Sequence, residues 1–249
     1  MIKVLINGCN GKMGQELAKA IDKNDNFKTI CGVDRVDTGD NKFPVYTDIS
    51  KITEEPDVII DFSIPVATFK ILEYAVNKHI PIVICTTGFS EEETKKIEEL
   101  SKQIPIFRSA NMSYEINLMS SLVAQITKYL KDADIEIIET HHNRKVDAPS
   151  GTALLLADRI NKELNNEMHY EYDRHSKREK RNKKEIGIHS IRGGNTVGTH
   201  TVTFFSENET FEITHTANSR GVFAEGALKA AEYLAVQDNG LYSMNDLIK

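Results

Sequence analysis

The segment Lys3–Ile21 reads KVLINGCNGKMGQELAKAI, in which a short apolar run leads through a glycine-rich turn into a helical pattern. Gly8, Gly11 and Gly14 space the turn, and glycines there let a phosphate group reach the backbone amides of a helix N-terminus. The common G-x-G-x-x-G spacing would put its first glycine at Cys9, so a turn that serves packing alone is the alternative interpretation. We expect the turn to bind the pyrophosphate of a dinucleotide through Gly8, Cys9, Asn10, Gly11, Lys12 and Met13.

A second apolar run, residues 29–33, ends in Asp34 and Arg35, about twenty residues after Gly14. An acidic residue at this position accepts hydrogen bonds from the free ribose hydroxyls of NAD, whereas an arginine accommodates the 2′-phosphate of NADP. Because the sequence carries both, we predict that NADH and NADPH are both used. NADH is the expected preference, since Asp34 is the closer match to the acid position.

Short apolar strands alternate with helical patterns up to about residue 112, as in residues 58–62, 66–77, 81–85, 91–102 and 105–107. This alternation predicts an α/β fold with a Rossmann-type, doubly wound parallel sheet. Polar loops follow the strands, and in such a sheet ligands bind beyond the carboxyl ends of the strands. We therefore expect further cofactor contacts from Cys85, Thr86, Thr87, Ser109, Ala110, Asn111 and Met112.

The pattern changes from about residue 114. A long helical pattern at 115–130 precedes apolar strands at 135–139, 185–191, 198–206 and 210–216, and a last helix is expected over 221–236. Three consecutive strands near the end indicate a second α+β domain with a mainly antiparallel or mixed sheet, covered by helices on one face.

The stretch 139–152 reads ETHHNRKVDAPSGT and connects a predicted strand to a predicted helix. Ser150 is placed either to cap that helix or to touch a ligand, and Gly151 and Thr152 would present amides that bind a carboxylate. Proton donors beside an anion-binding turn predict a catalytic pocket for a small acidic substrate.

These two segments together resemble the 4-hydroxy-tetrahydrodipicolinate reductase (dihydrodipicolinate reductase) family. The resemblance covers almost the whole chain and includes DFSIP at 61–65, TTG at 86–88, ANMS at 110–113, EIGIHSIRGG at 185–194, His200 and ANSR at 217–220. It implies an oxidoreductase that uses NADH or NADPH to reduce a cyclic dicarboxylate on the diaminopimelate route to lysine.

The resemblance also implies roles for individual residues. His141 aligns with the proposed general acid/base and Lys145 with the other proposed proton donor, while His142, Ser150, Gly151 and Thr152 are assigned to substrate binding. Residues 1–113 and 221–249 would form the dinucleotide-binding domain. Residues 114–220 would bind substrate and assemble a homotetramer through the sheet.

Three features depart from the family pattern. Cys85 stands where glycine is usual and Met112 where phenylalanine is usual, and we expect modest effects on cofactor affinity. The basic run HSKREKRNKK at 175–184 lacks the usual glycines and is expected to be a solvated loop, since it has no interleaved aromatic residues that would indicate nucleic-acid binding.

Composition excludes several other classes of protein. The formal net charge of −6 gives no general attraction to nucleic acid or to an anionic membrane surface, and no apolar run approaches the length of a membrane span. Three cysteines, an odd number, indicate a reduced, cytoplasmic protein without a disulfide framework.

Three alternative functions are less consistent with the sequence. Another two-domain dehydrogenase of amino or keto acids has no reason to carry the double-histidine segment. A non-catalytic dinucleotide sensor would be expected to lose His141 and Lys145, which are both present. A zinc hydrolase is disfavoured because adjacent histidines are poorly spaced for one tetrahedral ion, so no metal is expected.

Overall fold

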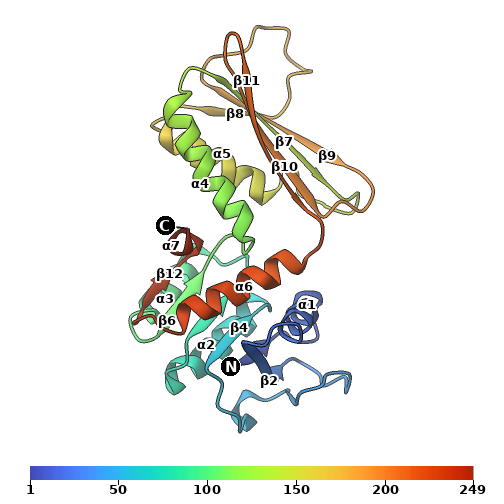
Figure 1. The fold of residues 1–249 in the computed structure, drawn as a ribbon, viewed down its shortest axis with the longest axis vertical. Coiled ribbons are helices and arrows are strands. Elements are labelled where there is room, and N and C mark those ends of the chain that lie inside the picture. Colours follow the sequence, from blue (N-terminus) through green and yellow to red (C-terminus); the bar gives the residue numbers. More distant parts are fainter. Residues whose placement is uncertain (249) are drawn as a thin grey trace. The chain divides into compact units, whose positions relative to one another are not determined.

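The computed structural model describes residues 1–248, which form two compact units (Figure 1). Unit 1 consists of Met1–Tyr114 together with the segment from Arg220 onward, and unit 2 is Glu115–Ser219. Each unit has its own sheet and its own apolar core. No helix within residues 1–248 has both the length and the apolar character needed to cross a membrane.

Unit 1 contains a seven-stranded sheet in the order β12-β6-β5-β4-β1-β2-β3, and every neighbouring pair is parallel. The order reverses between β1 and β4, which is where an open α/β sheet binds its ligand. The predicted doubly wound sheet is therefore confirmed. The strands are β1 (Ile2–Asn7), β2 (Phe27–Val33), β3 (Val45–Tyr46), β4 (Val58–Asp61), β5 (Ile82–Ile84), β6 (Pro105–Arg108) and β12 (Gly240–Tyr242).

Helices cover both faces of this sheet, so its central strands are apolar throughout. Successive strand residues point to opposite faces: Val4 and Ile6 belong to the core under α1 and α6, whereas Leu5 belongs to the core under α2 and α3. In α6 a Cβ atom on Gly226 would lie 1.7 Å from the carbonyl oxygen of Met112, so glycine permits the close packing of this helix. The helices are α1 (Lys12–Ile21), α2 (Pro65–Lys78), α3 (Glu91–Leu100), α6 (Gly221–Leu234) and α7 (Met244–Leu247), with a 3₁₀ turn at Ile49–Lys51.

Unit 2 contains a five-stranded mixed sheet in the order β11-β10-β7-β9-β8. The predicted mixed sheet is confirmed, with a detail that the sequence did not reveal: β7 lies between β9 and β10, so the consecutive strands β9 and β10 are not neighbours. Helices α4 and α5 cover one face, where Ile135 and Ile137 are buried (Figure 1). The elements are α4 (Tyr114–Tyr129), β7 (Asp134–His141), α5 (Gly151–Glu163), β8 (His169–Glu171), β9 (Glu185–Arg192), β10 (Gly198–Phe205) and β11 (Thr210–Ala217).

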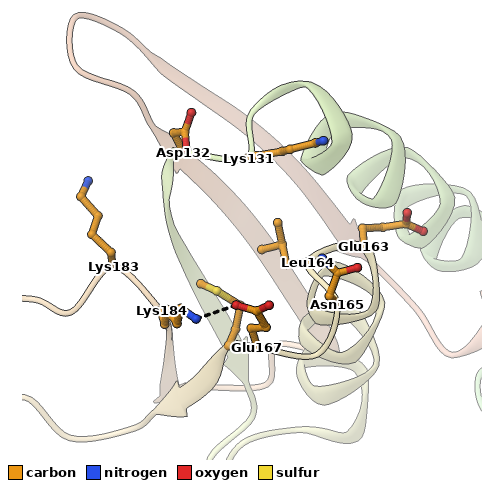
Figure 2. Close-up of a pocket in the computed structure, with 9 residues that line it drawn as sticks. Lys131, Asp132, Glu163, Leu164, Asn165, Glu167, Lys183 and Lys184 are labelled. Atoms are coloured by element: carbon orange, nitrogen blue, oxygen red, sulfur yellow. Dashed lines mark hydrogen bonds and ion pairs between the residues drawn. The ribbon is translucent and has the colours of Figure 1, made fainter.

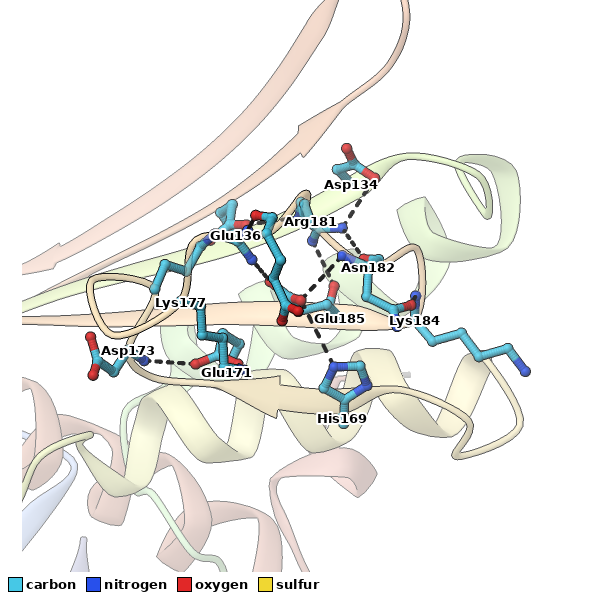
Figure 3. Close-up of polar contacts among 12 residues, drawn as sticks. Asp134, Glu136, His169, Glu171, Asp173, Lys177, Arg181, Asn182, Lys184 and Glu185 are labelled. Atoms are coloured by element: carbon cyan, nitrogen blue, oxygen red, sulfur yellow. Dashed lines mark hydrogen bonds and ion pairs between the residues drawn. The ribbon is translucent and has the colours of Figure 1, made fainter.

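The basic run between β8 and β9 is anchored to the sheet by ion pairs, although most of its residues are exposed (Figure 3). Arg181 donates to Glu136 and Asp134, each at 3.1 Å, and to three backbone carbonyls. Arg174 and Lys177 bond to the buried carboxylates of Glu185 and Glu171. Ion pairs with acids of β7, β8 and β9 therefore fix this loop to the sheet.

Candidate functional site

The glycine turn after β1 leaves the N-terminus of α1 open to an anion. Gly11 is the N-cap residue, it is exposed, and no side chain caps the helix amides. Gly8 has a φ of 80°, and a Cβ atom on it would lie 2.6 Å from the carbonyl oxygen of Phe62; one on Gly14 would lie 2.2 Å from the carbonyl oxygen of Gly8. These glycines permit tight packing, and the open helix start then offers the amides that a dinucleotide pyrophosphate requires.

Among the residues predicted to bind the cofactor, Cys9 and Met112 have side chains buried in the apolar core. Cys9 packs in the core against Gly32, where a Cβ atom would lie 2.6 Å from Cys9 Sγ, and burial raises the pKa of the Cys9 thiol to about 12. Met112 also belongs to the core of unit 1. Any contact that these two residues make with a dinucleotide therefore comes from the backbone.

Asp34 is half-buried at the end of β2 and joins the glycine turn to the following loop. Its carboxylate accepts hydrogen bonds from the amide of Asn10 at 2.8 Å and from the amide of Arg35 at 2.7 Å. The Arg35 side chain is exposed. A carboxylate fixed in this way beside the turn is suited to accept hydrogen bonds from ribose hydroxyls, because each oxygen keeps a second lone pair.

Asp61, at the end of β4, connects the loops that follow β4 and β5. The carboxylate is fully buried and accepts hydrogen bonds from Asn7 at 2.7 Å, Ser63 at 2.5 Å, Thr68 at 2.6 Å and Thr86 at 2.9 Å. Burial raises the pKa of Asp61 in spite of these bonds. Thr86 is thus occupied with loop structure, and it also accepts from the amide of Ser63.

The other predicted cofactor residues follow the same strand ends. Thr87 and Ala110 are exposed, and Cys85 and Ser109 are half-exposed. Asn111 accepts a hydrogen bond from the amide of Ser113 at 2.8 Å. Because all strands of this sheet are parallel, these loops and the glycine turn lie at one edge of it.

In unit 2, the end of β7 carries a buried cluster built on Glu139. Glu139 and His141 lie on the same face of the strand, and Glu139 Oε2 lies 2.5 Å from His141 Nδ1. Arg192, from β9, donates to both carboxylate oxygens at 2.7 and 2.8 Å, and the amide of Ser150 donates at 3.1 Å. Burial alone would raise the pKa of Glu139, but hydrogen bonds from Arg192, Ser190 and His141 lower it to about 2.

Ser150 begins α5 as its N-cap. The hydroxyl oxygen accepts from the amide of Ala153 at 3.1 Å and lies 3.0 Å from His200 Nε2, and the residue is buried. Of the two roles considered for Ser150, the structure shows helix capping. Gly151 is exposed at the first position of α5 and Thr152 is half-buried, so the amides at the start of this helix lie where the sequence predicted a carboxylate-binding turn; binding itself stays a prediction.

Lys145 and His142 lie just beyond the strand. β7 ends at His141, so His142 is already in the following loop, and its amide donates to the carbonyl of Thr196 at 2.8 Å. Lys145 Nζ lies 2.9 Å from Asp147 Oδ2. His141, Lys145 and the start of α5 therefore lie along one short segment, from the end of β7 to the first turn of the helix.

His200 packs edge-on against His141, with the ring centroids 5.1 Å apart. Burial and, to a smaller extent, the neighbouring His141 together lower the pKa of His200 to about 4. Since His200 is then neutral near pH 7, it adds no positive charge to the site.

The sequence did not assign Glu139. It left open whether Arg192 and His200 line the pocket, and Arg192 could equally pair with a surface acid. A signal for Glu139 was present, because residues two apart on a strand share a face, and Glu139 and His141 have that spacing. For Arg192 and His200 no local signal existed, since their positions follow from strand pairing.

A pocket of about 440 Å³ lies at the other end of β7 (Figure 2). Its mouth carries charges of both signs, among them the ion pair of Lys184 and Glu167 at 2.5 Å. Asp134 begins β7 and His141 ends it, so about 23 Å of strand separates this pocket from the histidine cluster. The lining residues are Lys131, Asp132, Glu163, Leu164, Asn165, Glu167, Met168, Lys183 and Lys184.

Comparisons with known proteins agree with this geometry. Sequence models described as dihydrodipicolinate reductase, N-terminus and C-terminus, match residues 2–112 and 115–248. A 4-hydroxy-tetrahydrodipicolinate reductase of Caldanaerobacter subterraneus subsp. tengcongensis is 53% identical over 100% of this chain and 99% of its own length. One of Clostridium tetani is 48% identical over 100% of this chain and 97% of its own length.

Solved structures give the same result. A dipicolinate-bound dihydrodipicolinate reductase from Paenisporosarcina sp. TG-14 superposes with a TM-score of 0.83 at 26% identity, covering 98% of this chain and 99% of that one. A myo-inositol dehydrogenase from Corynebacterium glutamicum, at 12% identity and a TM-score of 0.61, shares the fold alone.

The buried histidine predicts a pH dependence of stability. The pKa of His200 is lowered on folding, so the unfolded chain takes up a proton that the folded chain excludes, and stability is lost as the pH falls from about 6.5 to about 4. The loss is roughly 3 kcal/mol once both values are passed. Denaturant unfolding at several pH values should show this slope in the wild type and a smaller one in His200→Asn. The exposed His175→Asn serves as control and should keep the wild-type slope.

Proposed function

The chain belongs to the 4-hydroxy-tetrahydrodipicolinate reductase family. From this premise we propose which unit binds the cofactor and which binds the substrate. It is an oxidoreductase of the diaminopimelate route to lysine that reduces 4-hydroxy-tetrahydrodipicolinate with NADH or NADPH. Unit 1 holds the dinucleotide, and unit 2 holds the substrate and makes the subunit contacts. The observation that carries the assignment for unit 2 is the placement of His141, Lys145 and the start of α5 along one short segment.

The substrate is a small dicarboxylate, and unit 2 offers it one anion-binding turn. Amides of Gly151 and Thr152 at the N-terminus of α5 would bind one carboxylate, with His142 beside them. The Paenisporosarcina protein was solved with dipicolinate, a planar dicarboxylate of the same size class, which supports this choice of ligand.

The proton required by the reduction comes from His141 or Lys145. An imidazole can give and take a proton near neutral pH. The ammonium of Lys145 is paired with Asp147 and is partly exposed, so it could give a proton or hold a substrate carboxylate. Both groups would also stabilise negative charge that develops on the ring.

The cofactor fits unit 1 at the open start of α1. The uncapped amides after Gly11 would bind the pyrophosphate, and Asp34 would accept hydrogen bonds from the adenosine ribose. The bound nicotinamide supplies a hydride to the substrate ring. We place the enzyme in the cytoplasm, where its free cysteines Cys9, Cys31 and Cys85 would stay reduced.

We also propose that unit 2 assembles a homotetramer through the sheet face opposite α4 and α5. Ile138 and Ile191 are 41% and 51% exposed on that face. Paired threonine hydroxyls surround them, at 3.2 Å between Thr199 and Thr216 and at 2.9 Å between Thr201 and Thr214. Neighbouring exposed isoleucines on one face of a sheet are typical of a surface that is covered by another subunit.

Substitution of the proton donors should stop turnover without releasing the cofactor. His141→Ala and Lys145→Ala are each expected to lower kcat by roughly 10² to 10⁴-fold, the usual contribution of a general acid. The assay follows loss of nucleotide absorbance while the upstream synthase generates the substrate, and fluorescence titration should show unchanged NADH binding. Lys180→Ala, in the exposed loop, is the control. A wild type that binds NADH tightly and shows no turnover would indicate a nucleotide sensor instead.

Cofactor preference should depend on Asp34 and Arg35. Asp34→Ala is expected to lower kcat/KM for NADH by about tenfold, since a charge-assisted hydrogen bond to the ribose is lost. Arg35→Ala should lower kcat/KM for NADPH by about as much and leave NADH nearly unchanged. The exposed Asp40→Ala is the matched control. A wild type that prefers NADPH by more than about a hundredfold would contradict the NADH preference.

If the homotetramer forms through this sheet face, a charge placed on the face should lower the mass of the assembly. Ile138→Arg would place a charge in the covered face, so light scattering after gel filtration should show four chains for the wild type and fewer for the variant. Val236→Arg substitutes an equally apolar residue that is 81% exposed in unit 1 and should remain a tetramer. A monomeric wild type would refute the proposed assembly.

A further inference from the structure

The carboxylate of Glu139 has no part in the roles assigned so far, yet it is the most completely bonded acid in unit 2. It is 0% exposed, and it accepts from Arg192, Ser150 and His141. A buried carboxylate is usually a structural ion pair or a group that orients another residue. The contact of Glu139 with His141 at 2.5 Å favours the second case, because His141 is a proposed proton donor.

We propose that Glu139, held by Arg192, is the positioning residue that keeps the proton of His141 on Nδ1 and thereby makes Nε2 the atom that exchanges a proton with the substrate. This proposal rests on the role suggested above for His141.

The tautomer follows from the chemistry of the partners. Bidentate contact with Arg192 keeps Glu139 ionised at neutral pH, and an ionised carboxylate only accepts hydrogen bonds. Two acceptors at 2.5 Å would repel each other, so His141 Nδ1 must carry a hydrogen. Neutral His141 then has its lone pair on Nε2.

The surroundings of Nε2 agree with this assignment. A Cβ atom on Gly198, the first residue of β10, would lie 3.0 Å from His141 Nε2, so this edge of the ring is bounded by a residue without a side chain. His141 keeps a small exposed fraction, 11% of its side chain. Within unit 2, Nδ1 is therefore committed to Glu139, whereas Nε2 faces a glycine and not a side chain.

The proton transfer is balanced with these groups. The imidazolium gives the Nε2 proton to the substrate ring, the electron pair of that N–H bond stays on Nε2, and the Nδ1–H bond to Glu139 remains. Before transfer the Glu139 anion stabilises the imidazolium, and its charge is in turn matched by Arg192. No other reactant is needed for this step.

Arg192 extends the same arrangement to the second proton donor. Besides Glu139, its guanidinium donates to the carbonyl of Asp147 at 2.7 Å. The side chain of Asp147 binds Lys145 at 2.9 Å. One guanidinium thus joins the strand that carries His141 to the loop that carries Lys145.

The first test is nitrogen NMR of the imidazole, with histidine labelled and the His141 signal assigned by comparison with His141→Asn. We expect a protonated Nδ1 in the wild type at pH 9 and an unprotonated one in Glu139→Gln, because the amide NH₂ can donate to Nδ1. A wild-type Nδ1 without a proton would overturn the proposal, whether or not the enzyme turns over. The NMR result is therefore independent of the function proposed above.

The second test is kinetic. Glu139→Gln should lower kcat on the order of 10²-fold, with KM for both substrates changed less than about threefold, as expected when only a partner of the proton donor is altered. Glu136→Gln is the matched control: Glu136 lies on the same strand, bonded to an arginine and a histidine, but on the opposite face. Equal kcat losses in both variants would refute a positioning role.

Two further variants are needed. One tests whether an unpaired buried charge causes the loss of activity, and the other distinguishes the effects at the two ring nitrogens. Glu139→Gln combined with Arg192→Met removes both charges, so no unpaired charge stays buried; wild-type kcat in this folded double variant would overturn the proposal. Gly198→Ala crowds the Nε2 edge of the His141 ring and should lower kcat while the Nδ1 proton persists. Loss of that proton in Gly198→Ala would also contradict the assignment.

Discussion

A buried carboxylate must be given a counter-charge or enough hydrogen bonds, and the functional end of unit 2 is organised around this requirement at Glu139. Arg192 supplies the charge from β9, Ser150 supplies an amide from the start of α5, and His141 supplies a ring nitrogen. Satisfying one acid therefore joins two strands and a helix start. The proposed proton donor and the proposed carboxylate-binding turn are both fixed as a consequence.

Unit 1 meets the same requirement in a different way. Asp61 is as deeply buried as Glu139, but its four partners, from Asn7, Ser63, Thr68 and Thr86, are neutral. Burial therefore raises the pKa of Asp61, whereas the cation and the hydrogen bonds at Glu139 lower the pKa of that acid to about 2. Neutral donors suffice to tie loops together beside an anionic cofactor site.

How far the sequence predicts this molecule depends on how local each feature is. The glycine turn, the alternation of strands and helices, and the double-histidine segment are short-range patterns, and they predict the sheet of unit 1 and the segment that carries His141 and Lys145. The contact between Arg192 and Glu139 spans 53 residues and exists because β7 pairs with β9. The insertion of β7 between β9 and β10 has no local signature, so neither Arg192 nor His200 could be placed beforehand. Local patterns also have a limit, as Cys9 and Met112 show. Their motif positions predict proximity to a ligand, but both side chains point into the core.

Strand β7 carries two clusters of the same composition, and burial separates what they do. On the outer face Glu136 binds Arg181 and His189, and His189 is 40% exposed, so solvent screens these charges and the cluster serves to anchor a loop (Figure 3). On the inner face Glu139 is wholly buried, so the same residue types interact strongly and leave His141 a single way to carry its proton. Residue types and spacing alone would rank the two clusters equally. On the inner face, covered by α4 and α5, the buried ion pair also selects the tautomer of His141.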